Sequence, residues 1–381
     1  PGSAAARGPF GPADPFAGAS GRLRVGMLGC GDIAGRNASA IAAAPNVTLS
    51  ACYDTEARLA DDLARRFGGE AVRSVESLVG HPAVDAVLVC VPHHLHGPLT
   101  AQALRAGRHV IVEKPMAETL AAAAAMADEA ARAGTVLSVC FPQRYEPAVA
   151  VARRLVEAGA LGEPCGASVT LYLDKPPAYW IGGFSGRSRS TWRSSRRQAG
   201  GGVLVMNLSH HLDLLHHLLG LEVASVSATA GATDQAMEIE DAVSVGLTFA
   251  NGAVGSLTGG SAVRGSDASL LRVWGRDGHI IVEPAPRVFT LKAVDGLRPA
   301  RWHTFGRLPV VNSRAVYLSR LATAIHQGLP PDVGADRGLA VQAVIEAAYR
   351  SAETGVAVRP AALLAEVGAG RLPTPSWMGA P

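Results

Sequence analysis

The sequence predicts an α/β protein in which a doubly wound parallel sheet is followed by a second, α+β domain with a largely antiparallel sheet. Short apolar runs alternate with helical stretches from Leu23 to about Phe141, which is typical of parallel strands joined by crossover helices. This periodic pattern breaks over residues 159–202. Beyond that stretch, an Asn-Gly pair at 251–252 and an Asp-Gly pair at 277–278 favour hairpins between antiparallel strands.

Five strands are expected in the first domain. They are nearly all apolar, as in a sheet covered on both faces: Leu23–Leu28, Val47–Tyr53, Ala86–Val91, His109–Val112 and Val136–Phe141. A helix is expected at Thr55–Phe67, where a large apolar residue recurs every fourth position, and another at the alanine-rich stretch Thr119–Ala133. Glycines follow both helices and are typical of helix ends.

The second domain is predicted to begin with a helix at Pro147–Ala158. The irregular stretch 159–202 is interpreted as a binding loop, because structureless connections of this length are uncommon. A helix is then expected at Val203–Leu219 and another at about Arg337–Glu353. The predicted strands are Val223–Ala230, Ala242–Phe249, Ala253–Leu257, Leu270–Trp274 and His279–Val282.

The chain has 381 residues, which suits two domains at roughly 150 residues each. We assign residues 21–145 to the first domain and residues 146–358 to the second. Residues 1–20 are interpreted as a flexible leader and residues 359–381 as a tail rich in proline and glycine.

Composition excludes several classes of function. Thirty-five basic residues against 32 acidic ones leave a formal charge of only +3, which argues against nucleic-acid binding. No run of 18 apolar residues is present, so no membrane-spanning helix is expected. The five cysteines lack a C-x-x-C spacing and mostly lie in apolar runs, which indicates reduced thiols in a cytoplasmic protein.

Directly after the first strand the sequence reads Gly29-Cys30-Gly31-Asp32-Ile33-Ala34, a G-x-G-x-x-A fingerprint that opens a helix. Gly29 permits the tight turn, Gly31 permits close approach of a pyrophosphate, and Ala34 permits close packing of helix and strand. The N-terminus of the helix faces the phosphates. We therefore predict a dinucleotide site that includes these three residues together with Asp32 and Ile33.

The acidic residue Asp54 ends the second strand. A carboxylate there accepts hydrogen bonds from the adenosine ribose and disfavours a 2′-phosphate, so NAD is the expected cofactor. Arg58, one turn later, keeps NADP open as an alternative. Asp54 also suits the N-cap of the next helix, and the two roles are compatible.

Two further segments follow strands of the predicted parallel sheet, at the edge where such sheets bind ligands. Val91, Pro92, His93 and His96 follow one strand, and Glu113-Lys114-Pro115 follows the next. Lys114 is the sharper signal, because a lysine before proline at a strand end contributes little to packing. The histidines fit solvated loop positions as well as ligand contacts.

These residues resemble the Gfo/Idh/MocA group, named after glucose-fructose oxidoreductase, inositol dehydrogenase and MocA. The resemblance spans about residues 22–358 and is carried by the fingerprint, Val91-Pro92 with His96, the segment Ala106–Val110 leading to Glu113-Lys114-Pro115, Arg144, and Gly200-Gly201-Gly202 ahead of His210-x-x-Asp213. It implies a Rossmann domain, a second domain with a large open-faced sheet, and an NAD(P)-dependent oxidoreductase of sugars, cyclitols or polyols. It also implies a homodimer or homotetramer.

The resemblance implies roles for particular residues. Lys114 would contact the nicotinamide ribose and the substrate hydroxyl, and His210 would be the acid/base residue. Asp213 would hold a substrate hydroxyl or orient a neighbour, and we place Arg144 among the cofactor-binding residues. Many members carry an aspartate four residues before the histidine, where this chain has Met206.

On a regular helix, Met206, His210, Asp213 and His217 would share one stripe. A histidine and a carboxylate near the nicotinamide could exchange the hydroxyl proton, whereas a core histidine paired with the carboxylate is the plainer alternative. The spacing also allows a metal site, although hydride transfer to nicotinamide needs none, and we predict no metal. Asn207, beside Met206, can hydrogen-bond a substrate hydroxyl but cannot accept its proton.

The irregular stretch offers Tyr179, Trp192 and Arg193 as substrate-binding residues, with aromatic faces for sugar C–H groups and a guanidinium for an anion. Anchoring of the loop is the alternative role for its aromatic residues. The predicted function is hydride transfer between nicotinamide and a secondary alcohol or ketone of a sugar-like substrate. The alternatives are a redox-assisted lyase or glycosidase with tightly bound NAD, and a non-catalytic dinucleotide sensor.

Overall fold

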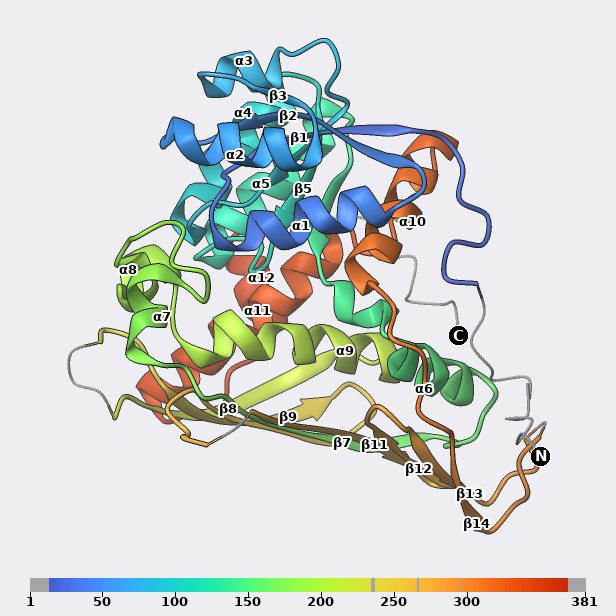
Figure 1. Ribbon diagram of the computed structural model, residues 1–381. Helices are drawn as coiled ribbons and strands as arrows, with labels where there is room; N and C mark the ends of the chain where they lie inside the picture. Colours follow the sequence, from blue (N-terminus) through green and yellow to red (C-terminus); the bar gives the residue numbers. More distant parts are fainter. Residues whose placement is uncertain (1–13, 234–236, 266, 295, 369–381) are drawn as a thin grey trace.

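A computed structural model describes residues 14–233, 237–265, 267–294 and 296–368 of the chain. Two sheets form its framework (Figure 1). The N-terminal sheet lies among helices on both faces, and the C-terminal sheet has helices on the face toward the first domain. Among the described residues, no helix covers its other face (Figure 1).

The first sheet has six parallel strands in the order β3-β2-β1-β4-β5-β6, which confirms the doubly wound Rossmann arrangement. Five of the strands coincide with predicted ones, and the short β3 was not predicted. The strands are β1 (Leu23–Leu28), β2 (Val47–Tyr53), β3 (Glu70–Ala71), β4 (Ala86–Val89), β5 (His109–Glu113) and β6 (Leu137–Cys140). Their apolar side chains are buried on both faces, which explains why the apolar runs predicted them.

The helices of this domain begin and end at local signals. Thr119 caps α5 by accepting a hydrogen bond from the Ala122 N–H, and Gly134 ends it in the left-handed conformation at φ 64°. The helices are α1 (Asp32–Ala43), α2 (Ala57–Phe67), α3 (Val75–Val79), α4 (His96–Arg105) and α5 (Leu120–Ala133), with a 3₁₀ turn η1 (His93–Leu95) before α4.

The second sheet has eight strands in the order β14-β13-β12-β11-β7-β10-β9-β8. Only β7 and β10 pair in parallel, so the prediction of a mainly antiparallel sheet is confirmed. The predicted Asn-Gly and Asp-Gly turns join β9 to β10 and β11 to β12. The strands are β7 (Pro164–Tyr172), β8 (Val223–Gly231), β9 (Ala242–Phe249), β10 (Val254–Gly260), β11 (Ala268–Gly275), β12 (Gly278–Val282), β13 (Arg287–Thr290) and β14 (Arg301–Thr304).

The expectation that residues 159–202 are irregular throughout was wrong, because β7 lies within them at the centre of the sheet. Ala167, Val169 and Leu171 are buried, while Ser168 and Thr170 point to the other face. This alternation is short and contains small and polar residues, so it left no apolar run. The strands β13 and β14 were also missed.

The helices of the second half lie mainly between the two sheets (Figure 1). They are α6 (Pro147–Glu157), α7 (Pro177–Gly182), α8 (Arg196–Ala199), α9 (Ser209–Leu219), α10 (Ser313–Gln327), α11 (Ala335–Thr354) and α12 (Pro360–Glu366); shorter turns are η2 (Pro142–Tyr145), η3 (Trp192–Ser194) and the π-helical η4 (Leu204–Leu208). The α10 helix was not predicted. The α12 helix occupies part of the predicted tail and buries Leu363, whereas residues 369–381 lie outside the described residues.

The predicted leader is only partly described, since residues 1–13 lie outside the described residues. At its end Ser20 is held in place: its N–H donates to the Thr323 hydroxyl and its carbonyl accepts from the Asn46 amide. All five cysteines are free thiols, and four of them are buried. Within the described ranges, no helix is long and apolar enough to cross a membrane.

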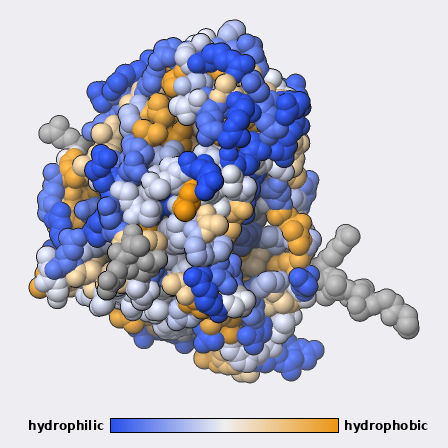
Figure 2. Space-filling model, turned by 60° about the vertical axis from the view of Figure 1, so that its left-hand side comes forward, coloured by the Kyte–Doolittle hydropathy of each residue, from blue (hydrophilic) through white to orange (hydrophobic). Residues whose placement is uncertain are grey.

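The surface is mixed in character. The side of the molecule that carries α7 and α8, brought forward in Figure 2, is mostly hydrophilic, with hydrophobic residues in separate patches. Scattered apolar residues of this kind are ordinary for a globular protein.

Candidate functional site

The fingerprint turn follows β1 at the carboxyl edge of the first sheet. Gly29 has φ +90°, and a side-chain carbon there would lie 2.6 Å from the Cys90 carbonyl oxygen, so only glycine fits. Asp54 braces the turn, because its Oδ2 accepts the Cys30 N–H at 2.7 Å while its Oδ1 accepts the Glu56 N–H at 2.9 Å. Asp54 thus links the fingerprint to the start of α2.

The fingerprint opens α1 as predicted. Gly31 is the residue before the helix, and Asp32, Ile33 and Ala34 form its first turn. Ala34 is fully buried, which agrees with close packing of helix against strand. The N–H groups of this turn have no earlier helical carbonyl to bond, so the turn suits an anionic group.

A segment of the second domain, residues 183–187, lies over this turn; we call it the strap. The Asp32 carboxylate accepts two backbone N–H groups of the strap, at 3.2 and 3.0 Å. Arg187 forms an ion pair with Asp62 of α2 at 2.8 Å, and its carbonyl accepts from Arg58 at 3.3 Å. The strap therefore joins the two domains across the dinucleotide fingerprint.

The loop after β4 is fixed by its histidines. His96 is fully buried, and its two ring nitrogens lie 2.9 Å from the Pro115 carbonyl and 3.0 Å from the Val91 carbonyl. His93 lies 2.7 Å from the Ala199 carbonyl through Nδ1. Burial lowers the pKa of both histidines, that of His93 well below its usual value. His96 thus joins the loops after β4 and β5, and His93 joins the loop after β4 to the α8 helix of the second domain.

Glu113 ends β5 and Lys114 follows it, and the two side chains have different partners. The Glu113 carboxylate is buried and accepts from Arg314 at 2.5 Å and from Asn37 at 2.8 Å. The Lys114 ammonium donates to the Met206 carbonyl at 2.5 Å. Burial lowers the pKa of Lys114 to about 8, against the opposing effect of Glu113. Glu113 is therefore committed to a structural ion pair, while Lys114 points to the second domain.

The turn that receives Lys114 is the π-helical η4, where a regular helix was predicted. Such turns are often found at functional sites. Glu240 holds it, since its carboxylate accepts the N–H groups of Gly202 and Leu204 at 2.7 and 2.9 Å and the Tyr349 hydroxyl at 2.9 Å. A side-chain carbon on Gly202 would lie 1.8 Å from the Glu240 carbonyl oxygen, which explains the last glycine of the triplet.

His210 is the second residue of the α9 helix, which begins just after this turn. Its Nδ1 is buried and makes no hydrogen bond to any residue that the structure describes. The ring meets Phe141 edge-on, with centroids 5.8 Å apart. Burial, and then the positive charge of Lys114, lower its pKa well below the usual value. His210 is therefore a neutral imidazole beside a charged amine.

Asp213 does not share the surroundings of His210. It is 1% exposed, and its two carboxylate oxygens accept hydrogen bonds from the Arg144 guanidinium. The predicted stripe of Met206, His210, Asp213 and His217 is thus divided between different partners. The geometry favours mutual positioning of Arg144 and Asp213 over the predicted contacts with cofactor and substrate, which stay predictions.

We call the part of the site that the second domain forms the substrate side. It contains a residue that was not predicted. Lys175 follows β7, is 3% exposed, and donates to the Asn207 side-chain oxygen at 2.6 Å. Its ammonium also lies over the rings of Tyr179 and Trp180, at 4.7 and 5.2 Å. Burial, and then Lys114, lower the pKa of Lys175 to about 7.

A signal for Lys175 was present in the sequence. The chain has 35 basic residues, but only Lys114, Lys175 and Lys292 are lysines. Both Lys114 and Lys175 stand directly before proline, Lys114 immediately after β5 and Lys175 shortly after β7, which ends at Tyr172. The signal was overlooked because the strand that Lys175 follows was not predicted.

Trp192 and Arg193 complete this side of the site. The Trp192 ring meets His93 at 4.5 Å, and the Arg193 guanidinium lies over the rings of Trp192 and Tyr179 at 4.8 and 5.3 Å. The aromatic residues of the irregular segment thus pack against one another and against the loop after β4. Among the described residues, no group of three His, Cys, Asp or Glu side chains is placed to hold a metal ion.

A parallel sheet with a dinucleotide fingerprint, facing a lysine and a histidine from two domains, defines an NAD-binding oxidoreductase. Residues 23–141 match the oxidoreductase family with an NAD-binding Rossmann fold, and residues 149–281 match the GFO/IDH/MocA C-terminal domain. The chain belongs to the Gfo/Idh/MocA family.

Similar proteins include dehydrogenases and reductases. The chain is 31% identical to 1,5-anhydro-D-fructose reductase of Ensifer adhaerens, over 76% of this chain and 84% of that protein. It is 29% identical to levoglucosan dehydrogenase of Pseudarthrobacter phenanthrenivorans, over 68% of this chain and 73% of that protein. A solved structure of levoglucosan dehydrogenase in complex with NADH and levoglucosan has a TM-score of 0.79 and 25% identity, and covers 89% of this chain and 99% of its own.

Proposed function

We propose that this enzyme transfers hydride between the nicotinamide of NAD and a secondary alcohol or ketone of a sugar, cyclitol or related polyol. The proposal rests on one contact. Lys114, at the edge of the dinucleotide domain, donates a hydrogen bond to the turn that precedes His210. The names of the similar proteins, a reductase of 1,5-anhydro-D-fructose and a dehydrogenase of levoglucosan, support a sugar-like substrate.

The proposed cofactor contacts use the carboxyl edge of the first sheet. Gly29, Gly31, Asp32, Ile33 and Ala34 would hold the pyrophosphate, and Asp54 the adenosine ribose. Only glycine fits at position 29, and the first N–H groups of α1 have no helical carbonyl to bond. Both features suit a pyrophosphate. Arg58 is exposed at the rim and would contact a 2′-phosphate by giving up its contacts with Glu56 at 2.5 Å and the Arg187 carbonyl at 3.3 Å, so NADP stays an alternative. Val91, Pro92, His93 and His96 shape the loop beside this edge.

NAD, when bound, supplies the hydride acceptor. Lys114 is charged below pH 8, and its ammonium would donate a hydrogen bond to the substrate oxygen. His210 is neutral, and a neutral imidazole would accept the hydroxyl proton of an alcohol. Asn207 would donate its amide N–H to a neighbouring hydroxyl, because its side-chain oxygen already accepts from Lys175. Both Lys114 and His210 act mainly through their placement.

Binding and turnover test this proposal together. NADH and NADPH are titrated by fluorescence, and sugars, cyclitols and keto-sugars are assayed at the nicotinamide absorbance. Wild type is compared with Lys114→Ala, His210→Ala and the surface control Lys292→Ala. We expect cofactor binding in all four proteins and turnover lost by at least about a hundredfold in the first two variants only. Full turnover in both variants would contradict the proposed roles.

The strap favours one alternative function, a redox-assisted lyase or glycosidase. Such an enzyme retains its NAD through the reaction, and the strap lies directly over the fingerprint. The observable difference is in the cofactor. A lyase would convert substrate with no net change in added NADH, whereas a dehydrogenase would consume or produce it stoichiometrically.

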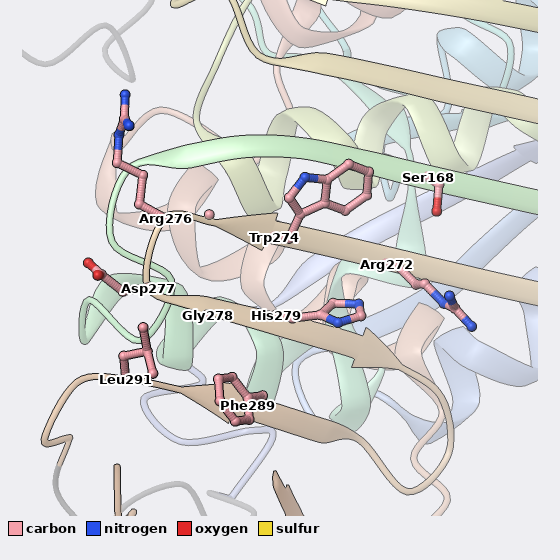
Figure 3. A pocket seen from close by; sticks show the side chains of 10 residues that line it. Ser168, Arg272, Trp274, Arg276, Asp277, Gly278, His279, Phe289 and Leu291 are labelled. Atoms are coloured by element: carbon pink, nitrogen blue, oxygen red, sulfur yellow. The ribbon is translucent and has the colours of Figure 1, made fainter. Parts of the chain in front are cut away.

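We also propose that the enzyme is a cytoplasmic homodimer or homotetramer that associates through the outer face of the eight-stranded sheet. This face carries a shallow cavity of about 470 Å³, where Trp274, His279 and Phe289 project from neighbouring strands (Figure 3). Trp302 beside it is 48% exposed. Trp302→Asp is expected to reduce the mass measured by light scattering, and an unchanged mass would exclude this face. The free thiols support the cytoplasmic location.

A further inference from the structure

Three cations lie together on the substrate side of the site. Lys114 and Lys175 come from different domains, and Arg193 adds a third positive charge. The charges of Lys114 and Arg193 both lower the pKa of Lys175, and that of Arg193 also lowers the pKa of Lys114. In the part of the chain that the structure describes, none of the three has a carboxylate oxygen within 4.0 Å. This is unusual for Lys175, which is 3% exposed.

The partners of these cations are neutral. Lys114 donates to a backbone carbonyl, Lys175 donates to the Asn207 amide, and Arg193 lies on aromatic rings. At position 206, whose carbonyl receives the Lys114 ammonium, this chain has methionine, so the side chain there adds no negative charge.

The carboxylates that act on Lys114 and Lys175 have other direct partners. Glu113 is paired with Arg314, and Glu240 holds the π-helical turn through two backbone N–H groups and a tyrosine hydroxyl. Asp267, the other acidic group that acts on Lys175, accepts the Asp174 N–H at 2.9 Å. A buried ammonium that no carboxylate pairs with directly is costly to keep charged, so a ligand that supplies negative charge beside Lys175 would favour its charged form and be bound by a charge-assisted hydrogen bond.

We propose that the substrate carries an anionic group, a carboxylate or a phosphate, which is bound by Lys175 together with Arg193 while Lys114 stays at the reacting hydroxyl. This rests on the proposed hydride transfer, and it narrows the substrate from polyols in general to acidic sugars and polyols. Lys175 is then a specificity residue. The rings of Tyr179 and Trp180 hold its ammonium in place beside Asn207.

The test compares acidic compounds with neutral compounds of the same skeleton. Gluconate is paired with sorbitol, glucuronate with glucose, and glucose 6-phosphate with glucose, which separates carboxylate from phosphate. Binding to the NADH complex is measured by calorimetry, and turnover is measured in parallel. We expect the acidic member of at least one pair to bind about 10- to 100-fold more tightly than the neutral one, as for a charge-assisted hydrogen bond.

Variants assign the preference to Lys175. Lys175→Met keeps the length of the side chain and should abolish the preference by raising KM with little change in kcat, while Lys175→Arg should retain most of it. Lys292→Met removes the exposed lysine, which is paired with Asp277 at 3.3 Å, and should change nothing. Lys175→Gln serves as a second neutral variant if the first does not fold.

Three outcomes would overturn the inference: equal affinity for both members of every pair, a preference that survives in the neutral variants, or a large increase in the Kd of NADH in Lys175→Met. The last result would assign these cations to the cofactor. A protein that binds no NADH at all would instead refute the proposed function, so the two failures are distinguishable.

Discussion

Removing one partner of the buried Arg144–Asp213 pair should destabilise the fold far more than removing both. The side chains are 5% and 1% exposed, and both carboxylate oxygens accept from the guanidinium. A single truncation leaves an unpaired charge inside the protein, for which the expected loss is about 3–5 kcal/mol of unfolding free energy. Arg144→Met also removes the hydrogen bond to the Asp332 carbonyl at 3.0 Å.

The double variant tests whether the pair itself stabilises the protein. Replacing a buried ion pair by apolar groups of similar volume is often neutral, so Arg144→Met with Asp213→Leu should lose less than either single variant. Urea unfolding of the wild type, the two singles and the double, followed by tryptophan fluorescence, gives the coupling. The exposed pair Arg24–Asp85 serves as the control and should show little coupling, because water screens it.

The reasoning fails if the losses in the two single variants simply add in the double. It fails in another way if Asp213→Leu abolishes turnover while its stability and cofactor binding are unchanged. That result would give Asp213 the direct substrate contact that the family resemblance implies. Loss of activity in proportion to loss of stability would agree with a positioning role.

Three further predictions concern pH and the strap. The free energy of unfolding should fall as pH decreases from about 6.5 toward 3, because His216 and His217 have a pKa of about 3 in the folded protein and take up protons on unfolding. When both are replaced by glutamine, the midpoint of urea unfolding should depend less on pH over this range. With a neutral substrate, kcat/KM should fall as pH rises through about 8, where Lys114 loses its proton, and pH profiles of Lys114→Arg should lack this limb. Arg187→Ala should release NADH about twofold to fivefold faster in stopped-flow fluorescence, since it removes the ion pair of the strap, while Arg65→Ala, which removes another partner of the same aspartate, should not.

The fold was predicted best where the sequence pattern has one physical cause. Parallel strands buried on both faces leave apolar runs, and Val47–Tyr53 was predicted with the bounds that the structure shows. The strand β7 was missed because its outward positions are polar and its inward ones include alanine. The α10 helix was missed because most of its circumference is buried, Ser319 included, so that no amphipathic stripe marks it.

Residues of the candidate site such as Lys114, Asn207 and His210 were named from the sequence, whereas Lys175 and the side-chain pairings were not. Lys114 stands out at a strand end, because that position is defined by the nearby sequence. Lys175 meets Asn207 only after the second sheet has formed, and Arg144 meets Asp213 across two elements far apart in the chain. Such contacts depend on tertiary structure, for which a single sequence carries no local signal.

The position of β7 has a consequence for how the enzyme is made. Both of its neighbours in the sheet come from much later in the chain, since β10 begins at Val254 and β11 at Ala268. The residues from Lys175 to His210 lie inside the loop that the β7–β10 pairing closes, and closing long loops is slow. During synthesis the first sheet is complete at Cys140, so a ribosome-bound chain can form the dinucleotide fold well before any substrate pocket exists. Substitutions that weaken β7 are therefore expected to yield protein that retains the coenzyme but lacks substrate selectivity.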